Sequence, residues 1–484
     1  MTSNDLATVL PASLVAGWAC LLLVVDLFIP RGRKGWTAFL AALGLVAALV
    51  SLLAGRAAGP TIGFGGMVVA DPFASFLQAV FLITGLIVLP LTVDYLRRMG
   101  LERGEYYSLL LFSLSGMMLM AQAGDLAVVF LALELLSLPL YVMAGFARPR
   151  PESEESAMKY FLLGAFASAL LVYGIALAYG ATGSTRLEAI VASIGGGQGN
   201  LRLLLLAAGL ILAGLGFKVA AVPFHMWTPD VYQGAPSPAA AFMSVGAKAA
   251  GFAALLRVFL AGFPALAAYW APAAMWISAF TMAWGNVAAI AQPNIKRMLA
   301  YSSIAHAGYI LMALAASNGP DLAGPAASSA VFYLLAYAVT NLGAWAVVMA
   351  VEAAEGRGLA IEDYAGLSRR RPWVALAMAI FMLSLTGVPP TVGFLAKFYL
   401  FRAVIDAGLV WLAIVGVVTS LVSAYYYLRV VVVMYMQAGE PETRSESWLN
   451  VSIGLTALAT LALGLLPGPI LAWAEQARLL TYLR

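Results

Sequence analysis

The sequence has few of the side chains that usually hold cofactors and metals. Its 484 residues include one cysteine, Cys20, two histidines, His225 and His306, and only 10% charged residues. An iron–sulfur cluster generally needs about four thiolates, so none is expected here, and one cysteine cannot form an internal disulfide. Two histidines give little support for bis-histidine haem ligation, and no histidine–carboxylate pair has metal-ligand spacing. No dinucleotide fingerprint, P-loop or GxSxG motif is present, so we expect no cofactor and no metal in this chain.

Apolar residues, in contrast, are in large excess. They make up 63% of the chain. Charged residues make up only 10%, whereas a soluble domain averages about 25%. Such a composition suits a lipid bilayer and does not suit a water-soluble core. The net charge of +4 is spread over short loops, as membrane topology requires, and does not indicate a nucleic-acid partner.

Long apolar segments define the expected fold, because a spanning helix needs about 20 mostly apolar residues. About fourteen such segments are predicted, which indicates an all-α polytopic membrane protein. They are 6–29, 36–54, 73–93, 106–123, 126–146, 158–180, 201–231, 237–260, 268–291, 299–316, 327–351, 373–404, 409–436 and 448–474. The first lacks a basic N-terminal region and a cleavage site, so we expect a retained helix and no signal peptide.

Basic residues are distributed unevenly between the loops on the two sides. About fifteen of them, Lys296 included, follow the first, third, fifth, ninth, eleventh and thirteenth segments, and about seven, Arg257 included, lie on the opposite side. The positive-inside bias places the richer set in the cytoplasm. With an even number of helices, both termini are then expected on the outer side.

Two of the predicted helices are interrupted, the seventh and the twelfth. The interruptions are at Pro223, Pro229, Gly387, Pro389 and Pro390. Proline breaks the helix ladder, which a bilayer tolerates where the backbone lines a cavity or packs against protein. Paired breaks five helices apart predict two inverted five-helix repeats with an ion path near the midplane, and two unrelated kinks are the alternative. The predicted domains are 1–105 with three helices, the repeats 106–263 (helices 4–8) and 264–440 (helices 9–13), and 441–484 with the last helix.

Five basic residues fall within predicted helices: Lys159, Lys218, Lys248, Lys397 and Arg429. Lys159 and Arg429 lie near helix ends and are expected to reach the interface. The other three lie several residues from either end, where a lysine costs about 2.5–3.5 kcal/mol on insertion scales. Burial disfavours the charged form, so a buried lysine can release and regain a proton near neutral pH, as a proton relay requires. The alternative is that each lysine only holds helices together.

Two further side chains suit a proton path. Glu134 is the only carboxylate deep within the fifth helix, and a movable carboxylate near a lysine would first favour and then release its proton. A protonated glutamate with a packing role is the alternative. His306 follows Ser302 and Ser303, and imidazole titrates near neutral pH, although a lone histidine in an apolar helix is often only hydrogen-bonded. His225 follows the first break, and both a relay role and the capping of freed carbonyls stay open.

Four stretches carry a resemblance to a known family: ELLSLPLY at 134–141, FKVAAVPFHMWTPDVYQGAPSP at 217–238, NIKRMLAYSSIAHAGY at 294–309 and GVPPTVGFLAKF at 387–398. They resemble the antiporter-like membrane subunits of respiratory complex I, the NADH-quinone oxidoreductase. The PDVYQGAP portion is similar to the subunit N type in particular. The resemblance is strong over about residues 106–436 and extends to the flanking helices by topology.

The resemblance implies a proton-translocating subunit of a respiratory translocase in the plasma (inner) membrane of a bacterium. It implies a relay through Glu134, Lys218, Lys248 and Lys397, to which the argument above adds His306. The family fold has about fourteen helices, two inverted five-helix repeats and both termini outside. NADH, FMN, iron–sulfur clusters and quinone belong to partner subunits of the membrane and peripheral arms. The partners are therefore those subunits and the lipid bilayer.

Three other functions fit parts of the same pattern: a subunit of a multisubunit cation/proton antiporter, a membrane subunit of a proton-pumping hydrogenase, and a scaffold that pumps nothing. The VYQGAP stretch favours complex I. The chain ends about ten residues after the last predicted helix, so we expect it to lack the long lateral helix of the largest sister subunit.

Overall fold

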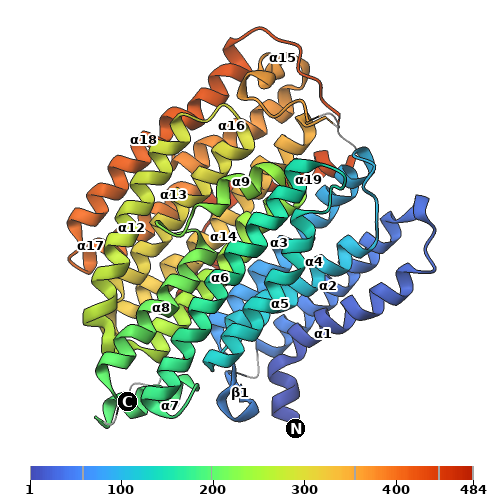
Figure 1. The fold of residues 1–484 in the computed structure, drawn as a ribbon. Helices are drawn as coiled ribbons and strands as arrows, with labels where there is room; N and C mark the ends of the chain where they lie inside the picture. The colour runs from blue at the N-terminus through green and yellow to red at the C-terminus, as the bar shows by residue number, and fades with distance from the viewer. Residues whose placement is uncertain (1, 57–58, 198, 354–355, 445–446, 482–484) are drawn as a thin grey trace.

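The computed structural model describes residues 2–56, 59–197, 199–353, 356–444 and 447–481. In these ranges the chain forms a bundle of long helices that run roughly side by side (Figure 1). Twelve of the helices are long and apolar enough to cross a membrane. They are α1 (Ser3–Asp26), α2 (Gly35–Gly55), α3 (Pro72–Arg98), α5 (Leu126–Ala144), α6 (Pro151–Thr182), α8 (Leu201–Val219), the span Ser237–Gly262 containing α10 (Ser237–Phe242) and α11 (Lys248–Arg257), α12 (Ala267–Ile290), α13 (Ile295–Ala316), α14 (Pro320–Val351), α18 (Val410–Met436) and α19 (Ser447–Leu465).

The remaining two predicted segments are also helical. The fourth is α4 (Glu105–Gln122), and the twelfth is divided into α16 (Pro372–Thr386) and α17 (Val392–Asp406). The prediction of an all-α membrane bundle is therefore confirmed. The last predicted segment is also interrupted, because α20 (Gly468–Gln476) follows α19 after a short break.

Some short elements were not predicted. A two-stranded antiparallel hairpin, β1 (Thr61–Gly63) and β2 (Val68–Ala70), precedes α3. The amphipathic helix α7 (Leu187–Gly195) lies between α6 and α8. At about 1.5 Å per residue, nine residues are too few to cross a bilayer.

Both predicted helix breaks are present. α8 ends at Val219 because Ala220 adopts a left-handed conformation with φ of 61°, and α9 (Trp227–Gly234) begins after a turn that contains Pro223. Pro229, where we also predicted an interruption, lies in the first turn of α9, where the missing N–H of proline is tolerated. α16 ends in the same way at Gly387, with φ of 93°, before α17 begins. A left-handed residue ends the i→i−4 hydrogen bonding and leaves the last carbonyls free for other donors. The inverted-repeat relation between the two halves stays a prediction.

Three spans form the centre of the bundle. The most apolar stretches of Ser237–Gly262 and of α14 are entirely buried, and α13 is nearly so. Small residues allow close packing here: a Cβ added to Gly285 on α12 would lie 2.6 Å from the Ala305 nitrogen on α13. Polar groups on the central helices are thus separated from lipid by the surrounding helices.

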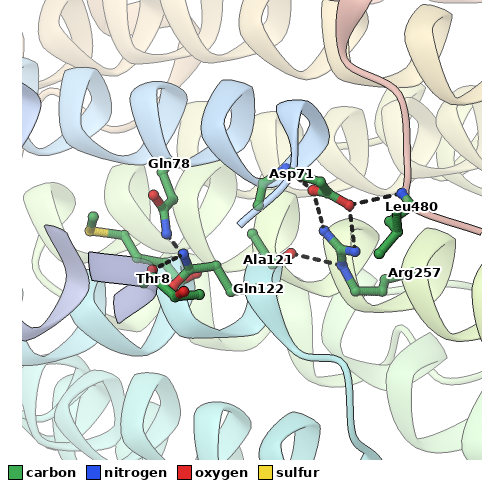
Figure 2. A network of polar contacts seen from close by, with 9 residues as sticks. Thr8, Asp71, Gln78, Ala121, Gln122, Arg257 and Leu480 are labelled. Atoms are coloured by element: carbon green, nitrogen blue, oxygen red, sulfur yellow. Dashed lines mark hydrogen bonds and ion pairs between the residues drawn. The ribbon is translucent and has the colours of Figure 1, made fainter. Parts of the chain in front are cut away.

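A buried ion pair ties three parts of the chain together on the hairpin side of the bundle (Figure 2). Arg257, at the end of α11, donates from Nη1 and Nη2 to Asp71 at 2.8 and 2.7 Å, and their side chains are only 2% and 1% exposed. Asp71 also caps α3 by accepting from Ala74 N, and it accepts from Leu480 N at 2.9 Å. The Arg257 Nε donates to the Ala121 carbonyl, so α4 joins the same network.

Arg257 and Lys296, which we assigned to loops, lie within helices and are buried. Arg257 forms the pair just described. Lys296, in the first turn of α13, is 2% exposed and donates from Nζ to the Ala235 carbonyl at 2.8 Å. The loop assignment was wrong for both, because a basic residue at a helix end can be held inside by a partner that is distant in sequence.

Candidate functional site

Lys218 lies at the first helix break, one residue before the end of α8. Its side chain is buried, and Nζ donates to Ser137 Oγ on α5 at 2.8 Å and to Tyr160 OH on α6 at 3.0 Å. Gly251 of α11 lies against its aliphatic part. Within the described residues no carboxylate forms an ion pair with it, so the amine is held by neutral hydroxyls.

Glu134 lies one helical turn before Ser137 on α5. Its carboxylate accepts a hydrogen bond from Ser168 Oγ on α6 at 2.6 Å, and the side chain is half-buried. Together with Tyr141 and other apolar side chains of α5 and α6, it lines a groove on the outside of the bundle. The structure therefore brings Glu134 to the neighbourhood of Lys218, with Ser137 between them, and not into contact with it.

Lys248 is the first residue of α11 and follows the π-helical segment Met243–Ala247. Its buried amine donates to the Ser303 carbonyl of α13 at 2.5 Å. A π-helical turn often marks a functional position in a helix, and nothing in the sequence pattern had indicated one here. Lys248 therefore joins the two central helices through a neutral acceptor.

His306 lies one turn after Ser303 on α13 and is held by two tyrosines. Its Nδ1 is 2.8 Å from Tyr333 OH, and its Nε2 is 3.1 Å from Tyr427 OH. Tyr427 also forms a short hydrogen bond with Ser302 Oγ. Hydroxyls can donate to or accept from either ring nitrogen, so this surrounding suits both tautomers.

Lys397 lies in the second turn of α17, after the second break. Its side chain turns back to α16, where Nζ donates to the carbonyls of Leu385 and Thr386 at 3.0 and 2.8 Å. It also donates to Ser420 Oγ on α18 at 2.7 Å. The second break therefore leaves carbonyls at the end of α16 that accept hydrogen bonds from this amine.

These groups form a row across the centre of the bundle. Ser303, His306 and Tyr309 recur every three residues on α13, and Lys397 Nζ lies 4.9 Å from the centre of the Tyr309 ring. A small cavity lined by His306, Tyr337, Ser384 and Leu385, among others, separates His306 from the second break. The order is therefore Lys218, Lys248, His306 and Lys397, with α13 joining the last three.

His225 does not join this row. Its ring packs against Trp284 of α12, with centroids 6.1 Å apart, and its buried Nδ1 has no hydrogen-bond partner among the described residues. The two basic residues expected near helix ends are partly exposed and form ion pairs: Lys159 with Asp230 at 2.6 Å, and Arg429 with Glu362 at 3.0 Å.

The sequence did not indicate the hydroxyl partners of the row. Tyr160, Tyr333 and Tyr427 are buried, and each lies on a different helix from the amine or imidazole that it contacts. A buried tyrosine usually has a partner for its hydroxyl, which is the one signal that could have found them. Among the described residues, no group of three or more His, Cys, Asp or Glu side chains could hold a metal ion.

Spanning helices, two of them broken beside buried lysines, define an antiporter-like membrane subunit. Residues 123–423 match the family described as NADH:quinone oxidoreductase/Mrp antiporter, TM. Subunit N of NADH-quinone oxidoreductase from Chloroflexus aggregans is 51% identical, with 98% of this chain and 97% of that protein covered. The subunit N of Trichlorobacter lovleyi is 45% identical over the same shares. The chain belongs to the NADH-quinone oxidoreductase subunit N family.

Solved structures agree with this assignment. A chain of respiratory complex I from Thermus thermophilus is 38% identical and superposes with a TM-score of 0.82, covering 96% of this chain and 99% of that one. A chain of the Mrp complex from Dietzia sp. has a TM-score of 0.85 at 22% identity, covering 99% of this chain and 97% of that one. The second likeness shows the shared fold alone.

Proposed function

We propose that this chain translocates protons as a membrane subunit of a NADH-quinone oxidoreductase. Its family membership supports assembly with the other membrane-arm subunits and with a peripheral arm that oxidises NADH through FMN and iron–sulfur clusters and reduces quinone. The chain itself contributes a proton path and no redox group. The membrane is the plasma membrane of a bacterium.

One observation carries this proposal: each of the three central lysines has only neutral hydrogen-bond partners among the described residues. Lys218 donates to two hydroxyls, Lys248 to a carbonyl, and Lys397 to two carbonyls and a hydroxyl. A fixed carboxylate partner would hold a lysine in its charged form, whereas neutral acceptors leave both forms accessible. A scaffold would gain nothing from three such lysines, because each is costly to bury.

Glu134 supplies a charge that can act on the first lysine from a short distance. Among the described residues its carboxylate accepts one hydrogen bond, from Ser168, so a change in a neighbouring subunit could shift it toward or away from Lys218. Moving one charge against 100 mV requires about 2.3 kcal/mol. One hydrogen bond to a charged group contributes about 1.5–3 kcal/mol, so a modest rearrangement is of the required size. The proposed sites are therefore Glu134, Lys218, Lys248, His306 and Lys397.

The orientation follows from the loops. Without Arg257 and Lys296, the basic residues divide about fourteen to six, so the bias keeps its sign. We infer that the loops after α3, α5 and α14 face the cytoplasm and that both termini face outward. We also infer that 106–263 and 264–440 are inverted repeats between the three N-terminal helices of 1–105 and the C-terminal part 441–484.

The test uses the assembled complex in inverted membrane vesicles, where NADH oxidation, quinone reduction and proton uptake are measured together. Lys218→Ala should abolish or strongly reduce pumping while the complex still assembles. Lys218→Arg should also impair it, because arginine stays protonated. Lys159→Ala is the matched control, since Lys159 is half-exposed and paired with acids, and it should pump normally. Full pumping by assembled Lys218→Ala would contradict the proposal.

A further inference from the structure

We propose that Glu352 is the group through which protons enter from the side of the basic loops. From Glu352 they would reach Lys248 along a row of polar side chains on α14. The inference rests on the proposed function and adds to it an entry site that lies outside the lysine row.

Glu352 directly follows the last residue of α14 and is 4% exposed. Its carboxylate accepts from Tyr95 OH on α3 at 3.1 Å and, through a short hydrogen bond, from Ser237 Oγ at the start of α10. Buried carboxylates are rare unless they are paired, and this one has hydroxyl partners. It is therefore placed at a junction of three helices, where it can bind and release a proton.

Positive charges surround Glu352 without forming an ion pair with its carboxylate in the described part of the chain. Arg98 of α3 donates to the main-chain carbonyls of Met349 and Glu352. Lys296 of α13 and Arg150 add to the local positive field.

Tyr364, in the turn that precedes α15 (Leu367–Arg370), also lies near Glu352. Its side chain is within electrostatic reach of the carboxylate, and its buried hydroxyl has no partner among the described residues. A polar group left in this way at the mouth of the row fits a position where water reaches Glu352.

From this junction a row of polar side chains follows one face of α14. Tyr337, Asn341 and Trp345 are four residues apart, so successive side chains are about 6 Å apart along the helix. Each has a buried polar atom without a partner in the described residues: Tyr337 OH, Asn341 Oδ1 and Trp345 Nε1. More than nine in ten buried polar groups are normally satisfied, so three in a row indicate ordered water between them.

The row leads to the lysine and histidine of the site. Asn341 Nδ2 donates to Ser244 Oγ at 2.7 Å, and Ser244 precedes Lys248 by four residues on the neighbouring central span. The Tyr337 ring lies 4.9 Å from the His306 ring. The most apolar stretches of α14 and of the Lys248 span are entirely buried, so this row lies inside the protein and away from its outer surface.

A purely structural role is the competing explanation, since Glu352 also ties α3 to α10 and α14. The two explanations differ in their pH dependence. Loss of an entry group makes proton delivery slow when protons are scarce, so the defect should grow as the pH rises. A packing defect should lower turnover by a similar factor at every pH.

The experiment measures uncoupled NADH:quinone turnover of the assembled complex between about pH 6 and pH 9. Glu352→Gln should be close to wild type at low pH and about a hundredfold slower at high pH, the lower end of what one proton-transfer group contributes. Glu352→Asp should recover most of the rate, because it restores a carboxylate. Glu362→Gln is the control: Glu362 is exposed, pairs with Arg429 on the loop side and should change nothing.

Asn341→Leu keeps the shape of its side chain and removes the polar atoms halfway along the row. It should give the same pH-dependent defect, and it decides the question if Glu352→Gln does not assemble. Wild-type profiles for these variants, or a defect that is constant with pH, would overturn the inference. In that case Lys218→Ala would still lose pumping if the proposed function holds, so the two failures are distinguishable.

Discussion

Replacing Asp71 with asparagine should destabilise the bundle strongly. The carboxylate accepts four hydrogen bonds, two from Arg257 and one each from the backbone nitrogens of Ala74 and Leu480. Asparagine keeps the shape of the aspartate side chain but removes its negative charge. Its NH₂ group would also face N–H groups that now donate hydrogen bonds to the carboxylate. Arg257 is then left buried with an uncompensated charge. Breaking a buried pair in this way costs about 3–5 kcal/mol.

The double replacement separates the value of the pair from the cost of breaking it. Asp71→Leu combined with Arg257→Met should be less destabilising than either single change, because no charge is left unpaired. The surface pair Arg402–Asp406, with side chains 68% and 60% exposed, supplies the control. Arg402→Ala should change stability by less than about 1 kcal/mol.

Thermal release of the subunit from the purified complex, followed by native electrophoresis, measures these differences. The complex with Asp71→Asn should release the subunit several degrees below the wild-type temperature. The release temperature of the double variant should lie between those of wild type and Asp71→Asn. A wild-type release temperature for Asp71→Asn would refute the reasoning, as would a double variant that is worse than both single variants.

Two further predictions concern the second break and the orientation. The glutamine of Lys397→Gln can still donate to the freed carbonyls of α16 but cannot carry a proton. Pumping by the assembled complex should therefore fail, and a normal proton-to-electron ratio would show that Lys397 is not part of the relay. A reporter inserted near Arg370 should be cytoplasmic, and one fused after Arg484, which lies outside the described residues, should be external, as the basic loops indicate; opposite labelling at both places would show that the helix count or the orientation is wrong.

The helices and both breaks could be predicted from the sequence because their causes are local. A run of apolar residues fixes a span, and Gly387 followed by Pro389 and Pro390 puts a left-handed residue and two missing backbone donors into one short segment. The positions of Arg257 and Lys296 could not be predicted in the same way. Arg257 is held inside by Asp71, 186 residues earlier in the chain, and no local pattern records that pairing.

The candidate site shows the same division. Lys218, Lys248 and Lys397 stand out because a charge within an apolar helix is visible in the sequence. Their partners do not stand out, since Tyr160 and Ser420 each come from another helix. The carbonyls that accept from the Lys397 amine are those at the end of α16. The sequence predicts that the helix breaks here, but it does not predict which carbonyls the break leaves within reach of the amine.

The hydrogen bond from Leu480 to Asp71 spans 409 residues and has a consequence for biosynthesis. A chain that is inserted as it is made exposes the Asp71 carboxylate long before Arg257 exists and before the last residues leave the ribosome. The final arrangement of the third helix must therefore wait for both. This contact can form only after Leu480 has been synthesised, so a ribosome that stops before that residue leaves the Asp71 carboxylate without one of its donors.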